Sequence, residues 1–408
     1  MKESNALVEE NFSNIVENVI SQLSNSEGKL INAIKNGEKD KEAIIKKAED
    51  ILTRKKITLD NEKFDELIIL INKKIFGYGI IDDLIEDDDI TDIKFVAPNN
   101  IRQKRKVGSK MVREKSSVEF RSLKEYEDFI SFVSTKNKSS TANIDAEQMV
   151  TDYTTSDKFI LRIAIGTEFI TSTGRSYMHI RKIPKDKKEL SELQKGGMMS
   201  VEEMNYLQEG MEKGMSFIVC GKGSAGKTTL INALIEAFPH TKAGLAIQES
   251  PELFSDKHPE FWFFIVKKTS GEAAFNYDLK NHSIFGLKTD IDLFCIGEIT
   301  GGEAYDFVNA CYTGYQVLGS LHAYNTREAL NKAVHYAKYS TDYEKSDLLE
   351  MFQAIDAVIF SENFEIKQIT EVEGFDKKNK DLIYNDVFIN HKRVANSCEK
   401  VMKKLVRE

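Results

Sequence analysis

The sequence is poor in cysteine, and its few cysteines are not grouped. Four occur among 408 residues, at Cys220, Cys295, Cys311 and Cys398, and none forms a C-x-x-C pair. A zinc site or a disulfide framework would need grouped or regularly spaced cysteines, so both are disfavoured. The pattern favours a reducing compartment, with Cys220 and Cys295 acting as small core residues.

Long apolar segments are also missing. The first ten residues lack the uninterrupted apolar region of a signal peptide. Phe261–Val266 is among the longest apolar runs, far below the ~20 residues of a membrane-spanning helix. We therefore expect a cytoplasmic protein that associates with the cytoplasmic membrane only peripherally.

An excess of basic residues is absent as well. The formal net charge is −8 at pH 7, which argues against a general nucleic-acid binder. We expect no direct binding to nucleic acid. One segment, Arg102–Lys110, is locally basic and has two interpretations. It could contact acidic lipid headgroups, but a solvent-exposed hairpin edge protected by lysines is the commoner structure.

The chain does contain enough apolar sequence for two or three domains. Residues 1–60 have apolar side chains at helical spacing and predict a helical N-terminal extension. Residues 61–184 mix helix and strand patterns, which predicts an α+β domain. A polar linker is expected at 185–199, followed by a further domain at 200–408. The predicted elements are helices at 64–72, 122–134 and 200–213 and strands at 90–96, 159–165 and 176–183.

A glycine-rich stretch fits G-x-x-x-x-G-K-[ST] from Gly221 to Thr228. An apolar segment before it, 215–220, predicts a buried strand, and residues 229–238 after it have helical spacing. Strand, loop and helix in this order form a phosphate cradle of backbone N–H groups at a helix N-terminus. Lys227 would reach the β- and γ-phosphates, and the Thr228 hydroxyl would bind Mg²⁺. The expected nucleotide contacts are Gly221, Lys222, Gly223, Ser224, Ala225, Gly226, Lys227, Thr228 and Thr229.

Three later segments carry polar side chains that could complete a hydrolytic site. A phosphate loop needs an acid on a neighbouring strand, and the apolar segment 291–298 ends in Glu298. The acidic segment with Glu252 also follows an apolar strand, although alone it is more typical of a charged loop. His322 lies at the end of another strand, where a single histidine is more often structural than catalytic.

Taken in this order, these segments resemble the traffic ATPases of the type II and type IV secretion superfamily. The resemblance is greatest to the CpaF-like branch, which powers assembly of Flp (tight-adherence) pili. The family's aspartate box, Walker B end and histidine box correspond to 247–252, 296–298 and 320–323. The resemblance covers roughly residues 60 to 335. Further matches to the family are Gly79–Ile85, Arg162, Ile180–Lys182, Thr313-Gly314 and Arg327–Leu330.

Several positions depart from the family pattern. Gln248 and Glu249 replace the first carboxylates of the aspartate box, and Thr300 replaces the arginine after the Walker B glutamate. Lys288 stands where an arginine usually precedes the Walker B strand, and the loop before Arg162 lacks the proline-rich pattern. These changes bear on turnover rate, on coupling between subunits and on which arginines act in trans.

The resemblance implies an α/β fold: a RecA-like P-loop NTPase domain at the C-terminus, an α+β N-terminal domain and the helical extension. It implies a homo-hexameric ring that binds ATP and Mg²⁺. Lys227 would hold phosphates, Thr228 and Glu298 would bind Mg²⁺, and Glu298 or Glu252 would activate water. His322 would sense the γ-phosphate. Arg162 and Arg181 could reach the phosphates across the interdomain cleft, although a surface salt bridge is nearly as probable for each.

The function implied is a ring-forming ATPase that couples ATP hydrolysis to pilus assembly or protein secretion across the cytoplasmic membrane. Its partner would be an inner-membrane platform protein of such a machine. Two alternatives stay open: a conjugation-type ATPase of the same superfamily, and a nucleotide-binding scaffold with little turnover, suggested by Gln248 and Thr300. A GTPase is disfavoured because no N-K-x-D guanine motif follows the loop. A transporter ATPase is disfavoured because Thr300–Glu303 comes after the Walker B strand, whereas an L-S-G-G-Q signature should precede it.

Overall fold

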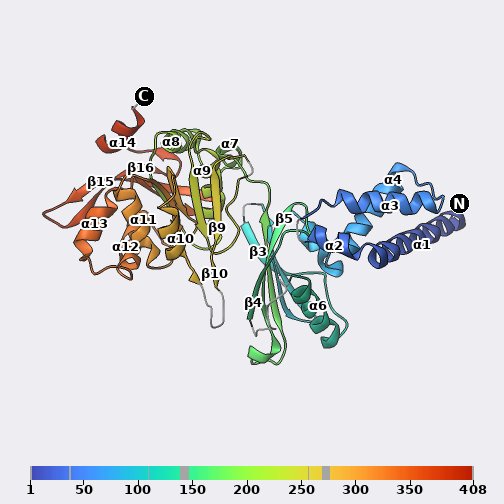
Figure 1. Ribbon diagram of the computed structural model, residues 1–408. Coiled ribbons are helices and arrows are strands. Elements are labelled where there is room, and N and C mark those ends of the chain that lie inside the picture. Colours follow the sequence, from blue (N-terminus) through green and yellow to red (C-terminus); the bar gives the residue numbers. More distant parts are fainter. Residues whose placement is uncertain are drawn as a thin grey trace. The chain divides into compact units, whose positions relative to one another are not determined.

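The computed structural model describes residues 2–35, 38–108, 110–137, 147–255, 257–268 and 276–406 (Figure 1). The chain divides into two compact units, Met1–Asp186 and Lys187–Glu408. Helices and sheets are mixed in the chain as a whole, which confirms the predicted α/β class. Among the described residues, none of the helices combines the length and the apolar character that crossing a membrane requires.

The first unit begins with four α-helices, which confirms the helical character predicted for the N-terminal extension. Their shared core draws on apolar residues at helical spacing, such as Ile44, Ala48 and Ile51. The fourth helix begins at a cap, because the Asp60 side chain accepts a hydrogen bond from the Lys63 N–H at 2.8 Å. The helices are α1 (Lys2–Ser26), α2 (Gly28–Lys35), α3 (Glu42–Arg54) and α4 (Asn61–Ile71), and the π-helical turn η1 (Asn72–Phe76) continues α4.

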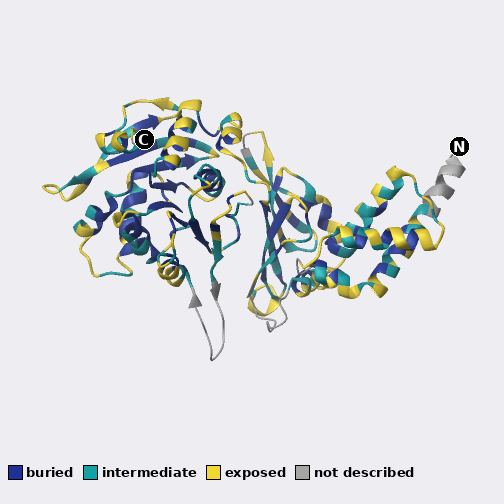
Figure 2. Ribbon diagram, turned by 45° about the horizontal axis from the view of Figure 1, so that its top comes forward, coloured by how far each residue is buried: buried dark blue, intermediate teal, exposed yellow. Residues whose placement is uncertain are grey.

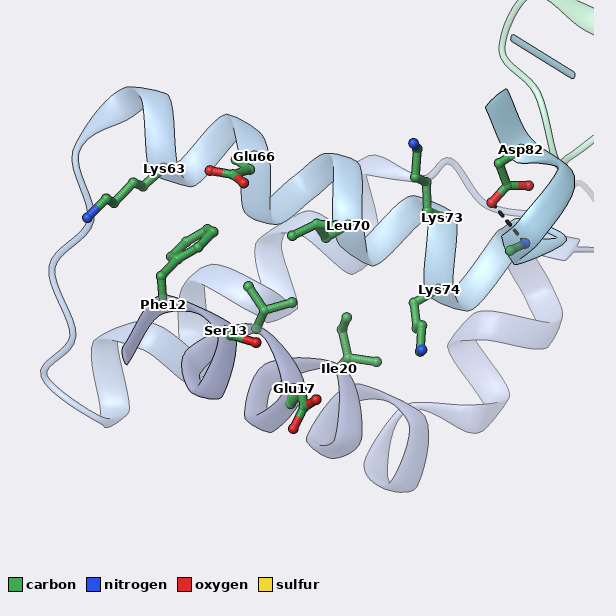
Figure 3. A pocket seen from close by; sticks show the side chains of 12 residues that line it. Phe12, Ser13, Glu17, Ile20, Lys63, Glu66, Leu70, Lys73, Lys74 and Asp82 are labelled. Atoms are coloured by element: carbon green, nitrogen blue, oxygen red, sulfur yellow. Dashed lines mark hydrogen bonds between the residues drawn. The ribbon is translucent and has the colours of Figure 1, made fainter. Parts of the chain in front are cut away.

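A cavity of about 700 Å³ lies between α1 and the segment α4–η1 (Figure 3). Phe12 and Ile20 of α1 and Leu70 of α4 form its apolar wall. At one end Asp82 accepts a hydrogen bond from the Gly79 N–H at 3.0 Å, drawn as a dashed line in Figure 3. The charged side chains around the cavity are of both signs, so they select no class of ligand: Glu17, Glu66 and Asp82 against Lys63, Lys73 and Lys74.

The first unit continues with an antiparallel sheet in the order β3-β2-β1-β6-β5-β4. Side chains alternate between its faces, and Ile93, Phe95, Ile163 and Ile180 face the core with α6 (Leu123–Lys136). The predicted strands and the predicted helix of this region are therefore confirmed. The strands are β1 (Ile90–Ala97), β2 (Asn100–Val107), β3 (Lys110–Lys115), β4 (Glu147–Asp152), β5 (Phe159–Gly166) and β6 (Tyr177–Pro184), and the short helices are η2 (Gly79–Ile81), α5 (Asp82–Glu86) and η3 (Glu168–Ile170).

A buried ion pair ties α6 to β4 in this unit. The Lys136 ammonium lies 3.8 Å from the Asp152 carboxylate, and their side chains are 4% and 1% exposed. The Tyr78 hydroxyl donates a 2.5 Å hydrogen bond to the same carboxylate. Burial alone would raise the pKa of Asp152, but the Lys136 charge and hydrogen bonds from Thr155 and Tyr78 outweigh it and hold the pKa below its ordinary value.

The second unit is built on a sheet in the order β17-β16-β15-β14-β7-β13-β12-β8-β9. The strands from β14 to β9 in this order run parallel to one another, whereas β15, β16 and β17 are antiparallel. The strands are β7 (Phe217–Cys220), β8 (Gly244–Gln248), β9 (Phe261–Ile265), β12 (Leu293–Ile296), β13 (Gln316–Leu321), β14 (Ala357–Glu362), β15 (Glu365–Asp376), β16 (Asp381–Ile389) and β17 (Lys392–Arg393), and β10 (Lys267–Lys268) and β11 (Asn276–Tyr277) form a separate pair.

Helices cover both faces of this sheet, so its central strands are buried throughout (Figure 2). One core lies between the sheet and α7, α8, α9 and α14, and the other lies between the sheet and α10–α13. Strands buried on both faces read as continuous apolar runs, as β7 and β12 do. The helices are α7 (Leu190–Lys195), α8 (Val201–Glu212), α9 (Lys227–Glu236), α10 (Leu279–Gly286), α11 (Glu303–Tyr312), α12 (Thr326–Ala337), α13 (Lys345–Phe352) and α14 (Glu399–Leu405).

The stretch 185–199, expected as a polar linker, contains the helix α7. Leu190 and Leu193 are spaced for one helix face and are buried in the core of the second unit, together with Met198. A capping box between Glu189 and Glu192 starts the helix. These residues therefore pack as part of the second unit, whose boundary lies before Lys187.

Candidate functional site

The candidate site lies at the carboxyl ends of parallel strands in the second unit. Leu321 of β13 pairs with Cys220 of β7, and Ile296 of β12 pairs with Gly319 of β13. Parallel pairing brings the ends of these strands to one edge of the sheet, where ligands bind in open α/β folds. The glycine loop, Glu298 and His322 follow β7, β12 and β13 at this edge.

The strand next to β7 differs from the expectation. We expected the acidic Glu298 on the neighbouring strand, but β13 lies between β7 and β12. Strand order depends on long-range pairing, which is not written in the local sequence pattern. Ser320 of β13 fixes the adjacent strand end, since its hydroxyl donates to the Gly297 carbonyl at 2.6 Å and its carbonyl accepts from the Ile299 N–H at 2.7 Å. His322 therefore stands between the loop and Glu298.

The loop itself requires glycine at its first position. Gly221 has φ 153°, and a Cβ there would lie 2.2 Å from the Ser361 carbonyl oxygen of β14. The Ser361 hydroxyl donates a hydrogen bond to the Ala225 carbonyl at 2.6 Å. Gly226, with φ 92°, immediately precedes Lys227 at the start of α9. The loop is thus fixed to β14, and its glycines permit a turn that other residues resist.

Lys227 lies inside the loop and is only 8% exposed. Its ammonium donates to the carbonyls of Gly221 at 3.1 Å and Lys222 at 3.2 Å. The same ammonium lies 3.4 Å from Nδ1 of His322. A buried ammonium needs such acceptors, and these two carbonyls hold Lys227 against the backbone of the loop.

His322 connects Lys227 to Glu298. Its Nε2 lies 2.8 Å from Oε1 of Glu298. An ammonium can only donate, so Nδ1 of His322 is the acceptor toward Lys227, and the proton of a neutral ring is then on Nε2, the nitrogen nearest the carboxylate. The side chains of His322 and Glu298 are 45% and 44% exposed. Three predicted site residues therefore form one contiguous chain that is open to a ligand.

Gln248 holds the acidic loop that carries Glu252. Its side-chain carbonyl accepts from the N–H groups of Glu252 at 2.9 Å and Leu253 at 2.7 Å, and its amide donates to the Leu253 carbonyl at 2.8 Å. Asn232 of α9 donates to the Glu252 carbonyl at 2.9 Å. The backbone of Glu252 is thus tied to the helix that follows the phosphate loop. A glutamate at 248 could not make the donated bond, so the glutamine is well suited to this clamp.

Thr300, the other departure from the family pattern, belongs to a helix start. Its N–H donates to the Glu303 carboxylate at 2.5 Å, and the Gly301 N–H donates to the same oxygen at 2.8 Å. A carboxylate at this place satisfies N–H groups at the beginning of α11. Position 300 therefore provides no cation to the site.

Arg162 and Arg181 lie in the first unit, on β5 and β6. They are directly opposite in the antiparallel register, so both side chains are on one face of the sheet. That face is opposite the one that packs on α6, and Asp92 of β1 lies beside Arg181 in register. The structure brings the two arginines together, while their contact with a nucleotide stays a prediction.

The sequence-based prediction missed residues that support the site. Ser361 and Asn232 hold the loop and the Glu252 segment, yet neither stands in a motif that would mark it. The sequence marked Gln248 only as a departure from the family's aspartate box. The available signal for its hydrogen bonds was an amide in place of a carboxylate. Thr228 and Thr229 lie half-buried in the first turn of α9, as predicted for residues after a phosphate loop.

Comparison with known families identifies one match, to the family described as Type II/IV secretion system protein, over residues 161–359. This span includes the loop, Glu298 and His322. This region is therefore similar to type II and type IV secretion system proteins. The match does not single out the CpaF-like branch.

Two relatives illustrate the extent of the similarity. An uncharacterized protein of Methanocaldococcus jannaschii is 25% identical over 277 residues, which are 68% of this chain and 48% of that protein. The type IV secretion system protein VirB11 of Brucella suis is 28% identical over 145 residues, 34% of this chain and 39% of VirB11. The chain thus spans about half of the first relative's length.

Two solved structures are similar in fold. The ATPase DotB of Legionella pneumophila aligns with a TM-score of 0.50 and 14% identity, over 83% of this chain and 82% of DotB. The pilus retraction motor PilT, solved with bound ADP, aligns with a TM-score of 0.50 and 15% identity, over 76% of this chain and 81% of PilT. These alignments confirm the predicted RecA-like fold class.

Proposed function

We propose that this protein is a ring-forming ATPase that couples ATP hydrolysis to pilus assembly or protein secretion across the cytoplasmic membrane. The observation that carries the proposal is the chain Lys227–His322–Glu298 at the carboxyl edge of three parallel strands. It joins a phosphate-binding cation to a carboxylate that can act on water. The names of the similar proteins, which include secretion proteins, ATPases and a pilus motor, agree with this class of activity.

The residues present fit a triphosphate and a magnesium ion. The Lys227 ammonium rests on two carbonyls that a phosphate would replace as its partner. Hydroxyl and carboxylate oxygens, from Thr228 and Glu298, are the ligands that Mg²⁺ prefers. When bound, the ion would neutralise charge on the β- and γ-phosphate oxygens.

Hydrolysis follows from the placement of these groups. Lys227 and the N–H groups of residues 221–228 hold the phosphates, and the start of α9 adds its positive dipole end. Water attacks the γ-phosphorus while the bond to the β–γ bridging oxygen breaks, giving ADP and phosphate. Glu298, or Glu252 from its clamped loop, orients the water and takes its proton. His322 links the γ-phosphate position to Glu298 and senses whether that phosphate is present.

Two arginines of the first unit have a catalytic role in this proposal. Charge develops on the transferred phosphoryl oxygens, and a supplied cation stabilises it. Arg162 and Arg181 provide that cation within a homo-hexamer. Hydrolysis then closes and opens the domains, and the motion moves pilin or secreted protein through an inner-membrane platform protein. The proposal places the protein in the cytoplasm at the membrane, in the CpaF-like branch.

A conjugation-type ATPase is the second candidate, favoured by the similarity to VirB11. It would use the same site with a different transported substrate. A scaffold without turnover has less support, because Gln248 still holds the loop that carries Glu252 through its side-chain hydrogen bonds.

The test is Mg²⁺-dependent release of phosphate from ATP by the purified protein, with Lys227→Ala as background. We expect turnover that EDTA abolishes. Phosphate release no faster than the Lys227→Ala background, with nucleotide still bound, would favour the scaffold instead. Light scattering with and without ATP tests the ring, and a monomer at high protein concentration in both states would overturn it.

A further inference from the structure

The phosphate loop contains a second lysine whose side chain behaves differently from that of Lys227. Lys222 follows Gly221 directly, and its side chain is exposed, whereas Lys227 is buried. The loop motif does not require a lysine at this position, which is one of the four variable ones. The motif therefore does not explain this exposed lysine in the loop.

The loop backbone next to Lys222 lies close to His322. A Cβ on the next residue, Gly223, would be 3.8 Å from Cε1 of His322. The Lys222 carbonyl accepts from Lys227, which fixes the backbone at this point. The lysine stem therefore starts at the rim of the cradle, next to the chain that joins Lys227 to Glu298.

The Lys222 ammonium lies over an aromatic ring. It lies 5.3 Å from the centroid of Tyr324, which is 66% exposed and follows His322 by two residues. The Tyr324 N–H donates to the Glu328 carboxylate at 2.8 Å, which fixes the backbone that presents the ring. A cation over an exposed ring is held weakly, and a charge-assisted bond to phosphate is stronger.

We propose that Lys222 leaves the Tyr324 ring and binds a γ-phosphate oxygen when the same loop holds a triphosphate. The inference rests on the proposed function, since it deepens the account of the same ATP site. The long, flexible lysine stem permits this change with the backbone fixed. Lys222 then supplies positive charge on the γ-phosphate side, where Thr300 offers none. Tyr324 holds the ammonium until the triphosphate binds, and so competes with the phosphate for it.

The experiment compares the affinities for ATP and ADP, each with Mg²⁺, in Lys222→Gln and Lys222→Arg. Removing the charge with glutamine should weaken ATP binding at least tenfold and ADP binding less than twofold, because ADP lacks the γ-phosphate. Arginine keeps the charge and should stay within about threefold of wild type for ATP. Lys195→Gln, an exposed change on α7, is the matched control and should bind both nucleotides as wild type does.

Tyr324 gives an independent arm. Tyr324→Leu removes the ring that competes for the ammonium, so ATP affinity should rise up to about threefold, whereas Tyr324→Phe keeps the ring and should raise it less. In the double variant Lys222→Gln/Tyr324→Leu, the leucine should change ATP affinity no further. A leucine effect that persists without Lys222 would overturn the assigned role of the ring.

The outcomes separate this inference from the proposed function. Equal weakening of ATP and ADP in Lys222→Gln, or no weakening of either while wild type binds and hydrolyses ATP, would overturn the inference alone. A wild-type protein that binds neither nucleotide would overturn the proposed function itself. A melting temperature for Lys222→Gln equal to that of wild type shows that the affinities refer to a folded protein.

Discussion

The two units differ in where their polar side chains lie. In the first unit the paired strands of the sheet are antiparallel, so one face packs on α6 and the other carries charged side chains such as Asp92, Arg162 and Arg181. In the second unit the central strands are parallel and are buried on both faces, so polar groups gather at the strand ends. Parallel strands thus concentrate the candidate chemistry at one edge, whereas the first unit spreads its arginines over a face.

The two units also differ in how a buried carboxylate is paired. The first unit buries the pair Lys136–Asp152 within its core. The second buries Asp356, whose carboxylate lies 3.3 Å from Lys400 and 2.7 Å from Lys404 of α14, and the side chains of both lysines are partly exposed. One carboxylate thus depends on a single buried lysine, and the other shares two lysines that reach solvent.

The largest effect concerns the strand-end carboxylate of the second unit. Glu298→Gln should lower kcat for ATP about 10³-fold, because an amide cannot accept the proton of water. ATP affinity should change little, since Lys227 and the loop are intact. Glu252→Gln, read in the same phosphate-release assay, identifies which carboxylate acts on water. Equal small losses in both variants would contradict a role for either.

The next effect concerns the buried pair of the first unit. Lys136→Ala leaves Asp152 buried without its cation and should lower the free energy of unfolding of this unit by about 3–5 kcal/mol. Urea unfolding followed by far-UV circular dichroism should show the loss. Trp262 is the single tryptophan and lies on β9, so its fluorescence reports the second unit and should keep its midpoint.

A double variant is the control for that measurement. Lys136→Met with Asp152→Asn removes both charges together and should lose clearly less stability than Lys136→Ala alone. A shift of the Trp262 transition equal to that of the dichroism transition would show that the two units unfold as one, against the division drawn here.

The sheet face of the first unit provides the third test. Arg162→Ala should lower kcat about 10²-fold, because one cation at the developing phosphate charge is lost. Arg102 is exposed on the same face, as its register opposite Lys94 shows, and Arg102→Ala should leave kcat unchanged. If the two substitutions changed kcat equally, Arg162 would have no catalytic role beyond that of a surface charge.

The Gln248 clamp should have a moderate effect. Gln248→Ala removes the partners of the buried Leu253 N–H and C=O groups and should destabilise the second unit by about 2 kcal/mol. Gln248→Glu keeps the two accepted bonds and should lose less. Trp262 fluorescence in urea measures both, and an unchanged midpoint for Gln248→Ala would show that the clamp is not needed for stability.

The smallest effect is a pH dependence in the first unit. Burial raises the pKa of Asp92, but hydrogen bonds from His179 and Thr91 outweigh burial and lower the pKa to about 2. The unfolded value is about 3.9, so stability from this group is present above pH ~4 and is lost as pH falls toward 2. In Asp92→Asn, the fall in the free energy of unfolding over this pH range should be about 1 kcal/mol smaller than in wild type. Urea unfolding followed by circular dichroism measures it. Asp128→Asn, an exposed change on α6, should keep the wild-type pH dependence.

Local patterns predicted local structure well. The strand before the loop, the helix after it and the capped helix after Ser200 are all confirmed, because each depends on nearby apolar spacing or capping residues. The position of β13 between β7 and β12 could not be predicted, since strand order depends on contacts between distant segments. For the same reason, the close contact between Ser361 and Gly221 could not be predicted.

The stretch 185–199 shows a different limit. Its charged residues and glycines favoured a linker, yet Leu190 and Leu193 are the parts that determine its place in the core. The capping pair Glu189 and Glu192 was the signal available for a helix. The charged residues and glycines indicated the exposed side of this segment, whereas the spacing of Leu190 and Leu193 indicated its buried side.

The coupling of Lys227, His322 and Glu298 can be measured as kcat for ATP in wild type, Glu298→Gln, His322→Gln and the double variant. If Lys227, His322 and Glu298 form one hydrolytic unit, wild type turns over ATP and the double variant is within about twofold of Glu298→Gln alone. Losses that multiply in the double variant would show that the histidine and the carboxylate act separately, and absence of turnover in wild type would contradict the account altogether.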